Sequence, residues 1–173
     1  MTDRTFATIV AAVLVVVAAA SRVIPHPWNF TPMIAVALFG GARISKSWLA
    51  VVGVLGCLAL GDIAIGVFPY EGMASVYISM LLVVVLGRTL RSRMSILATL
   101  VTALGAGALF FAITNFAVFA GTNLYPHTLA GLGECFVAAV PFYRNQIVGD
   151  LVFSGALFGI HAFALSLRRA AVA

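Results

Sequence analysis

A polar, proline-rich stretch interrupts a chain that is otherwise almost entirely apolar. The stretch SRVIPHPWNFTP, residues 21–32, holds three prolines together with His26, Trp28 and Asn29. The prolines stiffen the backbone, and a rigid loop loses little conformational entropy when it closes on a ligand. His26 and Asn29 offer hydrogen-bonding groups, and Trp28 offers a flat apolar face. The same residues also fit an interfacial turn with Trp28 in an aromatic belt, and both interpretations stay open.

Two acidic residues lie inside hydrophobic segments, where an ionisable side chain costs several kcal/mol unless it is paired or hydrated. Asp62 lies in LALGDIAIG and Asp150 lies in NQIVGDLVF. Acids of this kind bind substrates or ions, or hold helices together. We favour a functional role for Asp62 and leave both roles open for Asp150. Asn115 is expected to bridge helices, and His161 is expected to lie solvated near the cytoplasmic interface.

The elements that position these residues are expected to lie in a membrane. The chain has 173 residues, of which 63% are hydrophobic and 9% are charged, whereas soluble domains carry roughly 25% charged residues. We therefore predict a single transmembrane domain covering residues 1–173, embedded in the lipid bilayer. No basic stripe with interleaved aromatic residues is present, so nucleic-acid binding is not expected.

Known catalytic motifs are absent from the sequence. It contains no GxxxxGK[ST], HExxH or GxSxG pattern, so ATP hydrolysis by a P-loop and hydrolytic catalysis have no support. A membrane enzyme of another kind would need a nucleophile or a metal site, and only His26, His127 and Cys135 could build one. We expect no intrinsic cofactor and favour transport over catalysis.

Hydrophobic runs predict six transmembrane segments, because a span needs about 20 apolar residues. The second run is short and is expected to form either a stubby span or a re-entrant segment. Residues 128–142 carry Glu134 and two glycines, which favours an interfacial or loop helix. The first run also fits a signal peptide, but its length favours a retained helix. The segments are Thr5–Val23, Thr31–Ala42, Ser47–Phe68, Met73–Leu90, Ser95–Ala120 and Asn145–Leu167.

The distribution of Lys and Arg predicts the orientation, since cytoplasmic loops are enriched in positive charge. With six spans and a cytoplasmic N-terminus, only Arg22 and Arg144 lie outside, and the C-terminus is cytoplasmic as well. An alternative has the short second segment not crossing the membrane and the N-terminus outside. The excess of Lys and Arg on the cytoplasmic side is the same in that case. The charge distribution therefore does not decide on which side of the membrane residues 21–30 lie. The residues assigned to the cytoplasmic side are Arg4, Arg43, Lys46, Arg88, Arg91, Arg93, Arg168 and Arg169.

The order of several motifs resembles a group of small bacterial membrane proteins assigned to transport. The motifs are RVIPHPWNFTP, ALFGGA, a late Gly-Asp pair in the third segment, ITNFAVF, YPHTLAGLGECFVAAVPFYRN and GDLVF. That group is similar to the substrate-binding S components of energy-coupling factor (ECF) vitamin transporters. The resemblance implies an all-α, six-helix bundle in the bacterial cytoplasmic (inner) membrane. It also implies an outward-facing vitamin pocket beneath residues 21–32 and an ECF energising module as a partner.

A functional picture comes from solitary vitamin B12 transporters of the BtuM type, which resemble an S component without a dedicated ATPase module. Their functional set is a His after the first helix, an Asp in the third, a Tyr in the fourth and an Arg opening the sixth. The matching positions are His26, Asp62, Tyr77 and Arg144. Where those transporters have a cobalt-binding Cys, this sequence has Met73, whose thioether is a weaker ligand than a thiolate. His26 or Met73 is therefore expected to meet the cobalt of a bound corrinoid.

Together these features predict a membrane-embedded binding and uptake protein for a vitamin-like small molecule, with cobalamin or another corrinoid as the favoured substrate. Loops 21–32, 68–73 and 123–144 are expected to close its outward-facing pocket. A transporter of another vitamin or cofactor precursor, a membrane enzyme that modifies its bound cofactor, and a purely structural subunit stay open as alternatives. The expected substrate-binding residues are His26, Trp28, Asn29, Asp62, Tyr70, Met73, Tyr77, Arg144 and Asn145.

Overall fold

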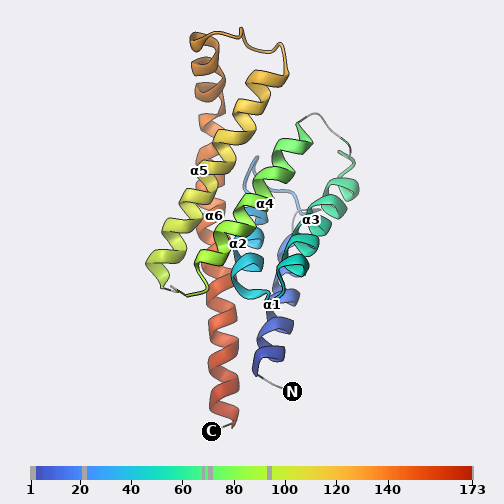
Figure 1. Cartoon of the computed structure of the whole chain (residues 1–173), viewed down its shortest axis with the longest axis vertical. Coiled ribbons are helices and arrows are strands. Elements are labelled where there is room, and N and C mark those ends of the chain that lie inside the picture. The colour runs from blue at the N-terminus through green and yellow to red at the C-terminus, as the bar shows by residue number, and fades with distance from the viewer. Residues whose placement is uncertain (1–2, 21–22, 68, 70–71, 93–94, 173) are drawn as a thin grey trace.

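A computed structural model shows that the described part of the chain is all-helical, as predicted (Figure 1). Its six helices alternate in direction, so both chain ends and the α2–α3 and α4–α5 connections lie at one end of the bundle. The structure describes residues 3–20, 23–67, 69, 72–92 and 95–172. The helices are α1 (Asp3–Ala20), α2 (Met33–Arg43), α3 (Ser47–Ala64), α4 (Met73–Thr89), α5 (Ile96–Gly121) and α6 (Leu129–Val172).

Helix α2 lies at the centre of the bundle and contacts each of the other five helices. Those five form a closed ring around it, in the order α1, α3, α4, α5, α6 and back to α1. Every residue from Met33 to Ala42 is buried, so this helix is apolar on all sides. Its 11 residues reach only about 17 Å at 1.5 Å per residue, well short of a hydrocarbon core about 30 Å thick. The short second segment is therefore a stub enclosed by protein.

Two glycines bring the backbones of α2 and α4 into direct contact. A Cβ atom added to Gly41 would lie 2.1 Å from the carbonyl oxygen of Val84, and one added to Gly87 would lie 2.3 Å from that of Leu38. Each helix thus presents a glycine to the backbone of the other. Small residues stabilise helix pairs in membranes by permitting this close approach, which brings many atoms into van der Waals contact.

Arg91, which follows α4, closes the carbonyl end of α2. Its guanidinium group donates hydrogen bonds to the backbone oxygens of Gly41 (3.1 Å), Ser45 (3.4 Å) and Ile44. These bonds satisfy carbonyl groups that a helix end leaves without intrahelical partners. The positive charge also interacts favourably with the negative end of the helix dipole. The α2–α4 pair is therefore joined both along its length and at its basic end.

The outer surface of the bundle is apolar, whereas several polar groups lie inside it. Val16 on α1, Leu60 on α3, Val85 on α4 and Val101 on α5 are each at least 60% exposed. Within the described residues, three helices, α3, α5 and α6, are long and apolar enough to cross a membrane. The chain therefore has the character of a membrane protein, as its composition predicted. The buried polar residues are Asp62, Ser79, Thr99, Gln146, Asp150, Ser154 and His161.

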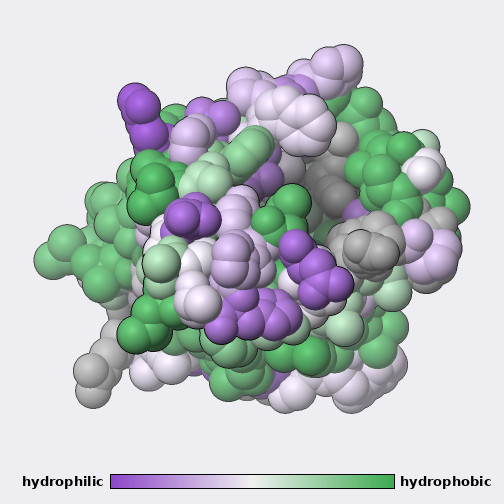
Figure 2. Space-filling view, turned by 90° about the horizontal axis from the view of Figure 1, so that it is seen from above, coloured by the Kyte–Doolittle hydropathy of each residue, from purple (hydrophilic) through white to green (hydrophobic). Residues whose placement is uncertain are grey.

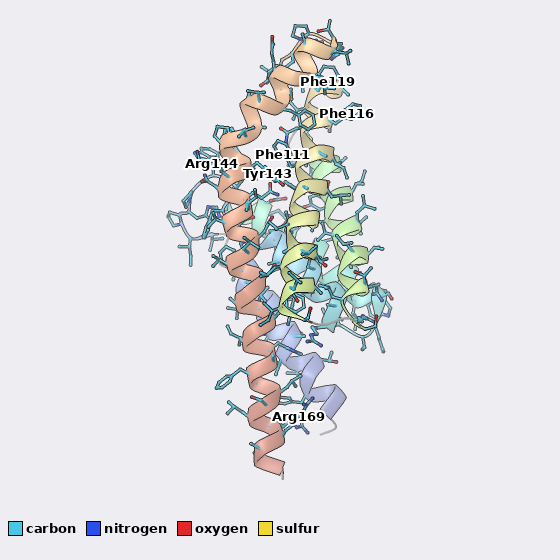
Figure 3. All side chains as sticks on the ribbon, turned by 90° about the vertical axis from the view of Figure 1, so that its left-hand side faces the viewer. Phe111, Phe116, Phe119, Tyr143, Arg144 and Arg169 are labelled. Carbon is cyan, nitrogen blue, oxygen red and sulfur yellow. The ribbon has the colours of Figure 1, made fainter. Side chains whose placement is uncertain are left out.

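The structure corrects the expectation for residues 123–144. Residues 128–142 do not form a separate interfacial helix or loop, because α6 begins at Leu129 and runs unbroken for 44 residues with Pro141 inside it. At 1.5 Å per residue, α6 is about 66 Å long, roughly twice the thickness of a hydrocarbon core. Its first half packs against the second half of α5, where Phe111 stacks on Tyr143 at 4.4 Å between ring centroids (Figure 3). The connection between α5 and α6 is limited to residues 122–128.

Two polar side chains differ from their sequence-based expectations. His161 is not solvated: it is 1% exposed, and its ring meets Phe39 edge-on at 5.4 Å, because this turn of α6 packs against the central helix. Asn115 does not bridge to another helix through its amide, since Nδ2 donates to the backbone oxygen of Phe111 in the same helix, at 2.8 Å.

The close approach of α2 and α4 makes a prediction. Gly41→Ala would force the two backbones apart, and overpacking of this kind costs about 1–3 kcal/mol. Gly53→Ala is the matched control, because a Cβ atom at Gly53 meets nothing within 4 Å. Thermal unfolding in detergent, followed by circular dichroism, should show a lower transition temperature for Gly41→Ala alone. Equal transition temperatures for the two variants would contradict the packing described here.

Candidate functional site

A cavity of about 210 Å³ lies inside the bundle beneath the polar loop that the sequence singled out. Asn29 and Thr31 of that loop line its outer side. An adjoining hollow of about 120 Å³ shares three of its lining residues, Asn29, Phe110 and Gln146. The remaining residues of the larger cavity come from α2, α3, α4, α5 and α6, and are Met33, Ile34, Leu58, Val76, Met80, Phe110, Gln146 and Asp150.

Asp150 and Gln146 place a polar pair in the wall of this cavity. They stand one turn apart on the same face of α6, and Gln146 Nε2 lies 3.5 Å from Asp150 Oδ2. Gln146 Nε2 also donates to the backbone oxygen of Gly107 on α5, at 2.9 Å. A Cβ atom at Gly107 would lie 2.5 Å from Asp150 Oδ2. Because Gly107 has no side chain, the carboxyl group of Asp150 fits between α5 and α6.

The loop over the cavity is fastened to α6. Asn145 Nδ2 donates a hydrogen bond to the backbone oxygen of Trp28, at 3.1 Å. Two residues further on, the Phe30 ring packs against Phe153 with 5.2 Å between ring centroids. Between these contacts, Asn29 has a φ of 60°, a left-handed conformation that Asn adopts more readily than most residues. This turn places Asn29 in the lining of the cavity.

Two of the expected site residues meet on neighbouring helices. The hydroxyl group of Tyr77 on α4 donates to Asp62 Oδ2 on α3, at 3.2 Å. Asp62 is buried, so this bond satisfies part of its hydrogen-bonding capacity inside the bundle. Neither residue lines the cavity described above, although Leu58 and Val76 from the same helices do. The pair therefore lies beside the cavity and couples α3 to α4.

The other expected site residues do not converge on the cavity. His26 and Trp28 are exposed, Trp28 by 79%. Met73 begins α4 and is half-buried. Arg144 lies on the side of α6 away from α5 (Figure 3), and Tyr70 lies outside the described residues. Figure 2, which looks onto the loop-bearing end, shows hydrophilic side chains gathered near its middle and hydrophobic ones around its sides.

Sequence reasoning missed Gln146 and left the role of Asp150 open. A usable signal was present, because Gln146 and Asp150 are four residues apart in NQIVGD and must share a helix face. Phe110 and Gly107 carried no such signal. Their roles depend on which face of α5 meets α6, and that is a property of the packing.

No three His, Cys, Asp or Glu side chains of the described residues gather where they could hold a metal ion. Cys135 is buried in α6 rather than placed in an outer loop, with its thiol 3.4 Å from the backbone oxygen of Asn115. His127 Nε2 lies 3.1 Å from the backbone oxygen of Thr122, and its ring packs against Phe119.

Comparison with known proteins identifies the family. The chain belongs to a family of unknown function (DUF6580), which matches residues 2–172. No curated protein matches the chain, and no solved structure does. The match covers all six helices, so the cavity and its loop lie within the region that defines the family.

The loop contact gives a prediction. Asn145→Ala removes the hydrogen bond to Trp28, which should weaken loop docking by about 0.5–1.5 kcal/mol. Hydrogen exchange followed by mass spectrometry should show faster exchange across residues 23–32, by between about two- and tenfold. Arg144→Ala is the control, because that side chain is exposed beside it. Unchanged exchange in Asn145→Ala would show that this bond does not hold the loop.

Proposed function

We propose that this member of the family is a membrane-embedded binding and uptake protein for a vitamin-like small molecule. The observation that carries the proposal is the loop-covered cavity, which Asn29, Thr31, Gln146 and Asp150 line together with six apolar side chains. Buried polar groups destabilise a fold unless they are hydrogen-bonded, and inside membrane bundles they mark substrate and ion paths. A small molecule that donates hydrogen bonds to the carboxyl group of Asp150 would satisfy the hydrogen-bonding capacity of this buried side chain.

The lining indicates the chemistry of the ligand. Asp150 and Asn29 offer oxygen acceptors, which suit an amine, amide or hydroxyl donor on the ligand. Phe110 offers a flat apolar face, and Met33 and Met80 offer flexible, polarisable walls. A compact molecule with an apolar ring and one or two donor groups is the best match. Several vitamins and their precursors have that character.

The size of the cavity bears on the corrinoid proposal. Its volume of about 210 Å³ is below the roughly 300–1,000 Å³ of pockets for drug-sized ligands, and a corrinoid is larger than such ligands. Cobalamin would therefore bind only after loop 23–32 moves away from α6, which breaks the contact between Asn145 and Trp28. The closed arrangement supports a smaller vitamin or cofactor precursor as the substrate. Cobalt ligation by His26 or Met73 belongs to the open-loop alternative.

Uptake through this site would use the loop as a gate. Residues 23–32 are joined to α6 by few contacts, which suits a segment that opens toward the outer side and closes over the bound molecule. We place the protein in the bacterial cytoplasmic membrane with both termini inside, because the basic residues gather at the end that carries the termini. An ECF energising module would be the partner that drives release.

The test is a binding titration on purified protein in detergent. Isothermal calorimetry with thiamine, biotin, riboflavin and cobalamin should detect a saturable ligand. Asp150→Asn should weaken its binding by about two- to tenfold, as expected for the loss of one hydrogen bond. Glu134→Gln, on the exposed surface of α6, should bind normally. Equal affinity in the two variants would contradict the role of Asp150, and a signal with cobalamin alone would favour the corrinoid alternative.

A second variant separates binding from folding. Asn29→Gly removes an amide from the cavity and suits the φ of 60° at this position, because glycine adopts that conformation without strain. We expect an unchanged unfolding temperature and an affinity lowered by about two- to tenfold, the effect of one hydrogen bond. Unchanged affinity in a normally folded Asn29→Gly protein would place the ligand elsewhere.

A further inference from the structure

A second and larger hollow lies at the other end of α2 from the polar loop. This groove has a volume of about 580 Å³ and shares no lining residue with the cavity beneath the loop. Arg43 at the end of α2 and Ser95 at the start of α5 supply polar groups. Gly155 and Gly159 of α6 form part of its apolar wall. The groove is therefore polar at one place and apolar along most of its surface.

Arg43 brings a positive charge to the groove. The carbonyl end of α2, the natural partner for a cation at this position, is already occupied by Arg91. Arg43 Nε is buried and has no hydrogen-bond partner, and the guanidinium carbon lies 6.0 Å from the centroid of the Phe158 ring. A buried donor without an acceptor is costly. Arg43 lines the groove, so its guanidinium charge would attract an anion there.

The start of α5 strengthens the attraction for an anion. Ser95 caps this helix by accepting a hydrogen bond from the backbone nitrogen of Ala98, at 3.0 Å, which leaves the serine hydroxyl hydrogen available to a ligand. The positive end of the α5 dipole lies at the same place. Ser95 and Arg43 both line the groove, so a phosphate group can contact both of them.

The apolar part of the groove opens toward the surface that faces lipid. Cβ atoms added at Gly155 and Gly159 would meet nothing within 4 Å, so these two positions leave a channel along α6. Ile96 at its edge is 83% exposed, and Ile160 and Phe163 on the neighbouring face of α6 are also exposed. Large exposed apolar side chains on a membrane bundle contact acyl chains. An occupant of the groove therefore enters from the bilayer rather than from water.

We propose that the groove bounded by Arg43, Ser95, Gly155 and Gly159 binds an anionic phospholipid. The phosphate lies at Arg43 and the Ser95 hydroxyl, and one acyl chain lies along the two glycines. Lys46, which is exposed beyond the end of α2, adds a positive charge that favours anionic lipid there. This inference is independent of the proposed uptake function, because it concerns a separate hollow that borders the other end of α2 and shares no lining residue with the loop cavity.

The proposal is tested by native mass spectrometry of the purified protein in detergent, titrated with phosphatidylglycerol or phosphatidylcholine. Wild-type protein should retain one phosphatidylglycerol molecule in preference to phosphatidylcholine. Arg43→Gln should weaken that retention by about fivefold, the effect of one basic residue on anionic lipid. Lys46→Gln is the matched control, because it removes a charge at the same end but does not line the groove. Equal losses in the two variants would overturn the proposal in favour of diffuse charge attraction.

A second pair of variants tests the apolar part of the groove. Gly159→Leu on α6 should fill the channel and abolish the selective retention of phosphatidylglycerol. Gly105→Leu is the control, because Gly105 is an equally open position on α5, and it should leave lipid retention unchanged. If Gly159→Leu instead breaks an oligomer while lipid retention stays intact, the groove holds a partner helix and the proposal fails. Displacement of the lipid by millimolar inorganic phosphate would also overturn it, because the site would then bind a free anion.

Discussion

The backbone contact between α2 and α4 is the constraint on which the rest of the structure depends. Gly41 and Gly87 let the two helices approach until the backbone of one touches the glycine of the other. A short apolar helix has no stable place in a membrane by itself, since it cannot cross the hydrocarbon core. Packed in this way, α2 becomes the axis around which the other five helices close into a ring.

The loop cavity and the basic-end groove border the two ends of that short axis. Helix α2 has only 11 residues, and residues near each of its ends line one of the two hollows. Met33 and Ile34 border the cavity under the polar loop, and Arg43 borders the groove at the basic end. The bundle thus has a polar-walled cavity at one end of α2 and a larger, mostly apolar groove at the other.

The two ends differ in the chemistry they can perform. At the loop end, Asp150 and Gln146 offer a fixed polar wall and the loop offers a cover held by the bond from Asn145 to Trp28. At the basic end, Arg91 bonds to the last carbonyl groups of α2, and Arg43 Nε stays without a hydrogen-bond partner. The two hollows share no lining residue, so each can be changed by substitution without altering the wall of the other.

Composition and local pattern determined much of this protein. The apolar runs predicted six helices, because helix formation depends on residues close in sequence. The positions where those runs end also predicted that most Lys and Arg residues lie at one end of the bundle. Only the tertiary structure decided that α2 is enclosed, that residues 128–142 continue into α6, and that His161 is buried. It also decided that Asn29 joins Asp150 at a cavity while Arg144 points away. These outcomes depend on which helix faces meet. The helices of this chain are apolar on nearly every face, so hydrophobicity alone does not select the faces that pack together. Close packing at small residues and pairing of a few polar groups select them.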